Sequence, residues 1–239
     1  MIAELALVMP VYNEEACIGE VVRSWYEMLE GLNISFQMII LNDGSTDASE
    51  EVLTPFGINE MIDIINKENS GHGPTILFGY KKAVELAEWV FQCDSDNEMS
   101  EKYFYMLWKR REAYDALFGV RRNRKQNIGR KIITLIAKIT TRFCFGEGIS
   151  DVNTPYRLIR SKFLKQIVDQ IPDDIFAPNV IIAGTLTQMA LRVYEHPVPH
   201  ESRKTGKVSI TNWKLWKSAV KSFWQTLSCR PIIKISNQT

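Results

Sequence analysis

The sequence predicts an α/β fold with a mostly parallel central sheet flanked by helices. Short apolar runs bounded by turn residues alternate with longer stretches of helical periodicity, which is the pattern of repeated strand–helix–strand units. Polar turn segments follow several strand-like runs, where parallel strands would place their carboxyl ends at one edge of the sheet. Hydrophobic residues make up 45% and charged residues 24% of the 239 residues, which is typical of a folded domain with one core of good size.

The expected elements alternate along the chain. Leu5 to Val11 is an apolar run typical of a buried strand, and apolar residues then recur from Ile18 to Leu29 at three- and four-residue spacing, as in a helix. The same reasoning gives strands at 38–41, 62–65, 89–93, 156–159 and 190–194, and helices at 73–87, 128–145 and 213–230. We expect one domain over residues 1–210, with 211–239 as a C-terminal amphipathic helix and tail that belongs to it or contacts a membrane or partner.

Charge, cysteine spacing and hydropathy narrow the function classes. The net charge of +1 argues against a general attraction to nucleic acid, so no nucleic-acid partner is expected. The cysteines lie far apart, without a CxxC pair, which favours a reduced cytoplasmic protein. The N-terminal run lacks a basic leader and a cleavage site, and no apolar run approaches the ~20 residues of a spanning helix. We therefore expect at most a peripheral contact with the inner face of a membrane, through 128–145 and the tryptophan-rich end.

The strongest local motif is an acidic cluster at the end of an expected strand. Asp94 and Asp96 alternate along extended chain, and a following turn can bring Glu98 to the same ion. Such hard oxygen ligands suit Mg²⁺ or Mn²⁺, which can bridge the phosphates of a nucleotide diphosphate and stabilise it as a leaving group. The alternative is an exposed acidic turn that caps the next helix through Asn97 or Ser100.

Two further polar segments are candidates for contacts with a nucleotide. Asp43 lies in NDGSTD, where Gly44 permits a tight turn, and its carboxylate can accept hydrogen bonds from a base or ribose. Asn69 and Gly71 lie in NSGHG, whose glycines let a ligand approach the backbone where a helix begins. The alternatives are a plain strand-to-helix turn and a loop in which His72 has no catalytic role.

Basic residues gather in two groups downstream. The first comprises Arg121, Arg122, Arg124, Lys125, Arg130 and Lys131, and the second comprises Arg203, Lys204 and Lys207. Because arginine matches phosphate oxygens in a bidentate way, these groups can bind a diphosphate or an anionic acceptor if folding brings them to the site. The alternative is a solvated basic face. His196 and His200, which flank two prolines, are expected to be structural or exposed.

Taken in order, these segments resemble family 2 glycosyltransferases of the GT-A fold. The matching stretches are VMPVYNEE at 8–15, ILNDGSTDAS at 40–49, NSGHGPTILFGYKKA at 69–83, CDSDNEMSEKY at 93–103, GVRRNR at 119–124 and HESRKTGKVS at 200–209. The most similar subgroup is the dolichyl- or polyprenyl-phosphate sugar synthases, which also carry a stretch like DVNTPYR at 151–157. The sequence departs from the pattern at Asn42, where an aspartate is usual, and at Glu98, where the subgroup has glutamine.

Motifs and resemblance together imply a role for each group of residues. The residues expected at the donor nucleotide are Pro10, Tyr12, Glu14, Asp43, Asn69 and Gly71. The metal and diphosphate site would comprise Asp94, Asp96 and Glu98. Contacts with the acceptor phosphate or donor diphosphate would come from Arg121, Arg130, Arg203 and Lys207.

The resemblance implies an inverting glycosyltransferase of hexosyltransferase type. It would move a sugar from a UDP- or GDP-sugar to a polyprenyl phosphate, with Mg²⁺ or Mn²⁺ as cofactor and Asp94 and Asp96 in the catalytic set. A sugar hydroxyl in polysaccharide or glycolipid synthesis is the alternative acceptor, and it needs a carboxylate base. Our candidate base is Asp174 or its neighbour Asp173, in PDDIFAPN, although this pair can instead cap a helix.

Two other function classes remain open. A nucleotidyltransferase also combines an α/β sheet with acidic metal ligands, but the chain lacks a glycine-rich loop with a lysine after its first strand. A non-catalytic module that binds nucleotide sugars would keep the same fold. Intact Asp94 and Asp96 argue against this second class.

Overall fold

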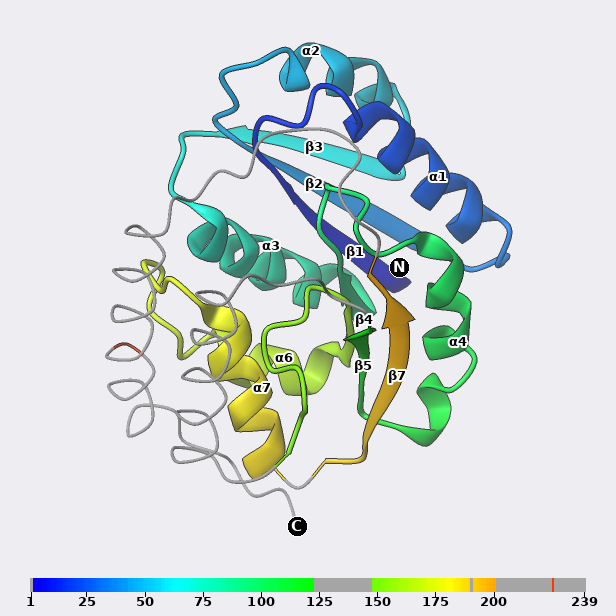
Figure 1. Cartoon of the computed structure of the whole chain (residues 1–239), viewed down its shortest axis with the longest axis vertical. Helices are drawn as coiled ribbons and strands as arrows, with labels where there is room; N and C mark the ends of the chain where they lie inside the picture. The colour runs from blue at the N-terminus through cyan, green and yellow to red at the C-terminus, as the bar shows by residue number, and fades with distance from the viewer. Residues whose placement is uncertain (1, 123–147, 190, 201–224, 226–239) are drawn as a thin grey trace.

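A seven-stranded mixed sheet forms the centre of the described part of the chain, residues 2–122, 148–189, 191–200 and 225 of this computed structural model (Figure 1). The strands are β1 (Ala3–Val11), β2 (Phe36–Asp43), β3 (Ile62–Lys67), β4 (Ala87–Gln92), β5 (Ala116–Arg122), β6 (Arg157–Arg160) and β7 (Val193–Pro199). The helices are α1 (Ile18–Glu30), α2 (Ser49–Leu53), α3 (His72–Leu86), α4 (Phe104–Trp108), α6 (Ser161–Val168) and α7 (Pro178–Gln188). Short 3-10 helices are η1 (Thr54–Ile58), η2 (Glu101–Tyr103) and η3 (Arg111–Ala113).

The strand order is β3-β2-β1-β4-β6-β5-β7. Strands β1, β2, β3 and β4 run parallel, and β5 runs parallel to β7, whereas β6 is antiparallel to both of its neighbours. The expected α/β fold with a mostly parallel sheet is therefore confirmed. The helix expected at 128–145, most of that at 213–230, and Arg130, Arg203 and Lys207 lie outside the described residues.

Alternate residues of the central strands pack into two apolar clusters, one on each face of the sheet. In β1, Leu5 and Leu7 pack in a cluster with side chains of α1 and α4, while Ala6 and Val8 pack in the other with side chains of α3, α6 and α7. Figure 1 shows α1 and α4 on one side of the sheet and α3, α6 and α7 on the other. Side chains alternate across a strand, so a strand buried on both faces must be apolar throughout. This explains why Leu5–Met9 of β1 and Met38–Leu41 of β2 are unbroken apolar runs.

Strand β7 begins later and extends further than the sequence indicates. We expected a strand at 190–194, but β7 runs from Val193 to Pro199 and pairs with β5 at the end of the sheet. Proline removes a ladder donor, which an edge strand tolerates because one side of it is unpaired. The extension places His200 at the same sheet edge as the end of β5, where its N–H donates to the Arg122 carbonyl at 3.1 Å.

No helix within the described ranges combines the length and the apolar character needed to cross a bilayer.

Candidate active site

The polar segments that follow β1, β2 and β4 meet at one edge of the sheet. Val8 of β1 lies opposite both Ile39 of β2 and Gln92 of β4, so β4 ends at the level of Val8, whereas β1 continues to Val11 and β2 to Asp43. Strands β2 and β4 flank β1, so their axes lie about 10 Å apart at the usual strand spacing. Asp43 and Asp94 therefore stand on either side of β1 at the carboxyl edge.

Hydrogen bonds between the loops hold this edge together. The Asn13 side-chain oxygen accepts from the Thr46 N–H at 2.7 Å, and the Asn13 N–H donates to Ser45 Oγ at 3.0 Å. Cys17 Sγ lies 3.6 Å from the Ser95 carbonyl oxygen, which connects the loop after β1 to the acidic segment. The expected convergence of the three polar segments is confirmed.

The residues expected beside a nucleoside occupy different depths of this edge. Pro10 is buried within β1, whereas the Tyr12 side chain is exposed. Glu14 is buried, and its N–H donates to Ser49 Oγ at 2.8 Å. Tyr12 and Glu14 thus follow directly on the strand that lies between Asp43 and Asp94.

Asp43 organises the loop that begins α3. Its carboxylate accepts from Lys67 Nζ at 2.5 Å and from the N–H groups of Ser70 and Gly71 at 2.9 Å each. Asn69 Nδ2 donates to the Asp43 carbonyl at 2.7 Å. Burial raises the pKa of Asp43, but the hydrogen bonds from Lys67 and Ser70 outweigh it and leave the pKa below its usual value. Asp43 is therefore anionic at neutral pH, and it forms one unit with the loop.

Two glycines make these turns feasible. Gly44 has a φ of +64° and Gly71 a φ of +91°, a region that disfavours residues with a Cβ. A Cβ on Gly44 would also lie 2.8 Å from the Asn69 nitrogen. The turn function expected for Gly44 is confirmed.

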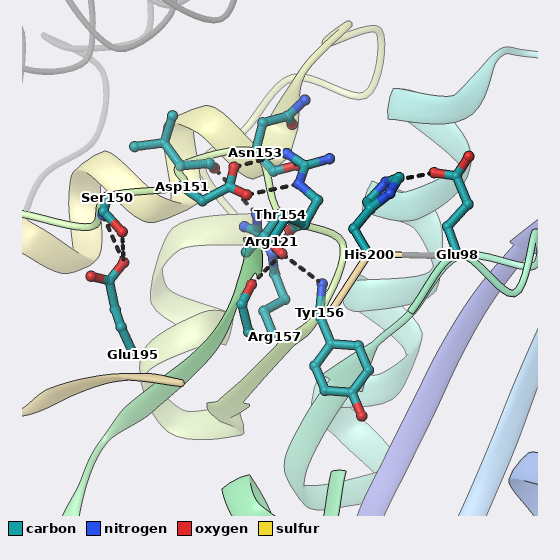
Figure 2. Close-up of polar contacts among 12 residues, drawn as sticks. Glu98, Arg121, Ser150, Asp151, Asn153, Thr154, Tyr156, Arg157, Glu195 and His200 are labelled. Atoms are coloured by element: carbon teal, nitrogen blue, oxygen red, sulfur yellow. Dashed lines mark hydrogen bonds and ion pairs between the residues drawn. The ribbon is translucent and has the colours of Figure 1, made fainter. Parts of the chain in front are cut away.

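In the acidic cluster each carboxylate has a different neighbour. Asp94 Oδ1 accepts from Gln92 Nε2 at 3.1 Å, and His72 Nε2 lies 3.8 Å from it. Asp96 Oδ1 accepts from the Glu98 N–H at 3.1 Å across a turn. Glu98 Oε2 is paired with His200 Nε2 at 2.9 Å (Figure 2). The longer β7 thus brings His200 into contact with the acidic cluster. Only 11% of its side chain is exposed, so the expectation of an exposed residue is wrong, and that of a structural residue stays a prediction.

The carboxylates of the acidic cluster fit a metal ion that is bound jointly by protein and substrate. No three His, Cys, Asp or Glu side chains of the described residues converge on one point that would hold an ion. Mg²⁺ is commonly held by one or two carboxylates together with substrate phosphates. Asp94 Oδ2 accepts no hydrogen bond from the described part of the chain, and Asp94 keeps 28% of its side-chain surface exposed. Asp94 and Asp96 suit such a site, and the role of Glu98 as a third ligand stays a prediction.

Arg121, at the end of β5, joins this acidic region from the far side of β6. Its guanidinium makes two hydrogen bonds to Asp151, at 2.7 and 2.8 Å, and a third to the Asn153 carbonyl at 3.2 Å (Figure 2). Burial lowers the pKa of Arg121, but Asp151 and the negative charges of Asp94 and Glu98 outweigh burial and raise it. Arg121 is thus a largely buried cation within electrostatic reach of the acidic cluster.

A second buried arginine shapes the loop that holds Arg121. Arg157 is fully buried and donates to the carbonyls of Thr154 at 2.9 Å, Val152 at 3.2 Å and Asn179 at 3.0 Å. Burial lowers the pKa of Arg157, and the nearby Tyr80 and Asp151 oppose that effect. We noted DVNTPYR as a motif without giving its residues roles, and the structure shows that its arginine fixes the backbone next to Asp151 (Figure 2).

The candidate base lies on a loop packed against α3. Asp174 is exposed, and Asp173 pairs with Lys81 at 2.6 Å. Helix α7 begins at Pro178 without a side-chain cap, so the alternative role of this pair as caps of that helix is wrong. A Cβ on Gly73 would lie 2.1 Å from the Phe176 carbonyl oxygen, which shows how closely the loop meets the first turn of α3. The catalytic role of Asp174 stays a prediction.

Comparison with known proteins connects this geometry to a family. Residues 6–168 match the sequence model described as glycosyl transferase family 2. Undecaprenyl-phosphate 4-deoxy-4-formamido-L-arabinose transferase from Salmonella choleraesuis (strain SC-B67) is 25% identical over 209 residues, which cover 86% of this chain and 62% of that protein. The chain thus spans less than two thirds of the length of this relative.

Solved structures share the fold at low identity. Glucosyl-3-phosphoglycerate synthase from Mycobacterium tuberculosis, in complex with Mn²⁺, UDP and phosphoglyceric acid, superposes with a TM-score of 0.72 at 18% identity over 97% of this chain and 80% of that one. TarS from S. aureus gives a TM-score of 0.55 at 14% identity, over 94% of this chain and 72% of that one. The chain, with its acidic edge and its mixed sheet, belongs to glycosyl transferase family 2 and has the GT-A fold.

Proposed function

We propose that this chain carries out inverting transfer of a sugar from a nucleotide-diphosphate sugar to a polyprenyl phosphate. The observation that carries the proposal is that the end of β5, with the largely buried cation Arg121, meets the acidic cluster through His200, which pairs with Glu98 at 2.9 Å and donates its N–H to the Arg122 carbonyl at 3.1 Å. A site for two phosphorylated substrates needs such a cation beside its metal-binding carboxylates. The name of the Salmonella relative, a transferase acting with undecaprenyl phosphate, supports the same acceptor class.

The donor would lie along the carboxyl edge of β1, β2 and β4. Asp43, with the loop of Asn69 and Gly71 that it holds, would receive the nucleoside, with Tyr12 and Glu14 beside it. Asp94 and Asp96 would hold Mg²⁺ or Mn²⁺, which when bound neutralises charge on the leaving diphosphate. The UDP and Mn²⁺ named with the Mycobacterium structure support this cofactor and donor class.

The acceptor would approach from the side of β5. Arg121 can contact phosphate oxygens through guanidinium N–H groups that Asp151 does not use. One acceptor phosphate oxygen attacks the anomeric carbon, and the bond from that carbon to the diphosphate oxygen breaks on the opposite face. A phosphate monoester is ionised near neutral pH, since its second pKa is about 6, so this route needs no general base. Asp174 would matter only for a hydroxyl acceptor.

A lipid acceptor also implies contact with a membrane. We place the enzyme in the cytoplasm, peripherally bound to the inner face of the membrane through the basic segment 128–145 and the tryptophan-rich segment 213–230. Removing the aromatic side chains of 213–230 should weaken the binding of the protein to vesicles of anionic lipid.

The test is a donor panel. Labelled UDP- and GDP-sugars are incubated with the protein, Mn²⁺ and a short polyprenyl phosphate, and label is measured in the organic phase. We expect labelled lipid from one donor, and a loss of at least about 100-fold in Asp94→Ala and Asp96→Ala, because the charge on the leaving group is then uncompensated. Asp63→Asn is the control, since Asp63 of β3 pairs with Lys82 of α3 at 2.7 Å, away from the acidic cluster.

Other outcomes would replace the proposal. In parallel incubations that offer phosphoglyceric acid or a water-soluble glycan beside the polyprenyl phosphate, label confined to either of them would assign a hydroxyl acceptor, and Asp174→Asn would then be the variant to measure. Release of pyrophosphate from a nucleoside triphosphate would indicate nucleotidyl transfer.

A further inference from the structure

We propose that Tyr80, Asn179 and Gln92 form a buried hydrogen-bond chain whose function is to position Asp94. None of these residues belongs to the acidic motif. They lie on α3, α7 and β4, and they meet directly behind the carboxylate. The inference rests on the proposed function, since it assigns these side chains as positioning residues for a carboxylate that binds the donor through its cation.

The distances define a continuous chain. Tyr80 Oη lies 3.0 Å from Asn179 Oδ1 and 3.1 Å from Gln92 Oε1. Asn179 Nδ2 lies 3.0 Å from Gln92 Oε1, and Gln92 Nε2 lies 3.1 Å from Asp94 Oδ1. All four contacts fall within normal hydrogen-bond lengths, and the one hydroxyl proton of Tyr80 serves one of its two acceptors at a time. The chain therefore leads from the body of α3 to one oxygen of Asp94.

Donor and acceptor chemistry gives this chain a single direction. Ionised Asp94 can only accept, so the Gln92 amide must present its NH₂ group to Asp94 and its oxygen to the core. The Asn179 NH₂ group donates to that oxygen, which leaves the Asn179 oxygen to accept from Tyr80. The hydroxyl proton of Tyr80 can be donated to this Asn179 oxygen. Every donor thus points towards Asp94, and hydrogen bonds aligned in this way strengthen one another in a buried setting.

Burial keeps the hydrogen-bond chain of Tyr80, Asn179 and Gln92 away from water and keeps Tyr80 protonated. Tyr80 and Gln92 are fully buried and Asn179 is 4% exposed. Burial raises the pKa of Tyr80, Arg157 opposes that shift and Asp94 adds to it, so the phenol keeps the proton that it donates. Arg157 also donates to the Asn179 carbonyl at 3.0 Å, which fixes the first turn of α7.

A purely structural role explains the chain less well. Tyr80 otherwise packs in the apolar cluster between α3, α6, α7 and the sheet, where apolar side chains would fill the space without buried polar groups to satisfy. The last donor of the chain goes to Asp94, a partly exposed carboxylate at the functional edge. With Oδ1 held by Gln92, the Asp94 carboxylate has a fixed orientation for binding a cation through Oδ2.

The experiment measures Mn²⁺ affinity by calorimetry, in excess UDP and in parallel in excess GDP. Outer-shell partners of metal ligands typically contribute 10- to 100-fold in affinity, so Gln92→Leu should weaken Mn²⁺ binding on the order of 10- to 100-fold. Tyr80→Phe removes only the hydroxyl and should weaken binding by about 3- to 10-fold. Thr185→Val is the matched control, because it removes a buried hydroxyl of α7 that bonds within its own helix and should leave Mn²⁺ affinity unchanged.

The double variant separates positioning from general stability. If Tyr80 acts through Gln92, adding Tyr80→Phe to Gln92→Leu should weaken Mn²⁺ binding no further than Gln92→Leu alone. Additive losses, or a lower stability of Tyr80→Phe with unchanged Mn²⁺ affinity, would overturn the inference. Should Gln92→Leu fail to fold, a loss of Mn²⁺ affinity in folded Tyr80→Phe but not in Thr185→Val supports the inference, and equal affinities reject it. Asp94→Ala tests the underlying proposal, because wild-type Mn²⁺ affinity in that variant would reject the metal role of Asp94 itself.

Discussion

The Asp43 carboxylate joins the ends of β2 and β3 to the loop that begins α3. Lys67 is the register partner of Asp43 across these strands, and the backbone of Ser70 and Gly71 closes around the same carboxylate. The Asp43 side chain is 5% exposed, so its charge is stabilised by these contacts rather than by bulk water. Residues that are expected to receive a nucleotide thus depend on one ionised group.

Replacing Asp43 by Asn should make the free energy of unfolding depend less on pH in the acidic range. Asp43 has a lowered pKa in the folded state, so its contribution is fully present above its unfolded pKa of about 3.9 and is lost as pH falls through the folded value. Asp43→Asn should lower the free energy of unfolding by about 1–3 kcal/mol at pH 7, because an amide cannot compensate Lys67. Urea unfolding at pH 7 and near pH 3 measures the difference, which should shrink in acid.

Asp63→Asn provides the comparison for this change. Asp63 pairs with Lys82 while partly exposed, and such pairs contribute about 0–1 kcal/mol. A difference between wild type and Asp43→Asn that stays constant with pH would show that the lost contribution is packing rather than charge.

Single residues were predictable where the signal is local. Gly44, Asp94 and Asp96 stand next to a strand end within a short motif, so their position at the carboxyl edge follows from the sequence. Lys67 and His200 were missed because their partners are remote: Lys67 meets Asp43 through strand register, and His200 meets Glu98 across the sheet edge. Register and edge pairing are tertiary facts that local spacing does not specify.

At the scale of elements, helix α3 connects the loop of Asn69 and Gly71 to the loop that carries Asp174. Its second residue, Gly73, lies against the backbone of Ile175 and Phe176, and Gly79 further along lies against Val8 and Leu41. Both glycines lie in close contact with another segment, but Gly73 contacts the loop that carries Asp174, whereas Gly79 contacts the core. Any side chain at Gly73 must displace backbone.

This difference predicts two distinct phenotypes. Overpacking in Gly73→Ala and Gly79→Ala should cost about 1–3 kcal/mol each, and the ~1 kcal/mol that alanine gains in a helix offsets part of this cost, so we expect a net destabilisation of up to about 2 kcal/mol. Gly73→Ala should also weaken nucleotide binding, since it displaces the start of α3 next to Gly71, whereas Gly79→Ala should not. Urea unfolding and titration with UDP or GDP plus Mn²⁺ measure the two effects. Equal losses of nucleotide affinity in both variants would contradict this assignment.

Elements of the first half followed from the sequence more closely than those of the second. Strands β1 and β2 are apolar on both faces and are bounded by turn residues, so their pattern is clear. The short helix α4 and the 3-10 helices around it were not expected, because they are too short to show a helical period. The predicted extent of β7 was wrong because proline ends a central strand but is tolerated in an edge strand.

At the scale of the whole molecule, antiparallel β6 lets two parallel units share one edge. The unit β3-β2-β1-β4 carries Asp43 and Asp94, and the unit of β5 and β7 carries Arg121 and leads to His200. The sequence predicted the strands of the first unit from their alternation, but it predicted no strand at β5 and did not specify the order in which the two units join. That order places Arg121 and His200 near the acidic cluster although both follow it in the chain.

A site assembled from both units should stabilise the whole fold when it is filled. A nucleoside diphosphate with Mn²⁺ that binds only the folded state adds about 2.7 kcal/mol at 100 times its dissociation constant. For a chain of this size each kcal/mol raises Tm by roughly 2–4 °C, so we expect an increase of about 5–10 °C. A thermal melt with UDP and with GDP should show this shift for the base that the donor panel selects, and EDTA should abolish it.

The shift should also vanish in Asp94→Ala, because the diphosphate then loses the cation that links it to β4. An equal shift in the presence of EDTA would mean that the nucleotide binds without the carboxylates, and the linkage between the acidic edge and the fold would then have to be abandoned.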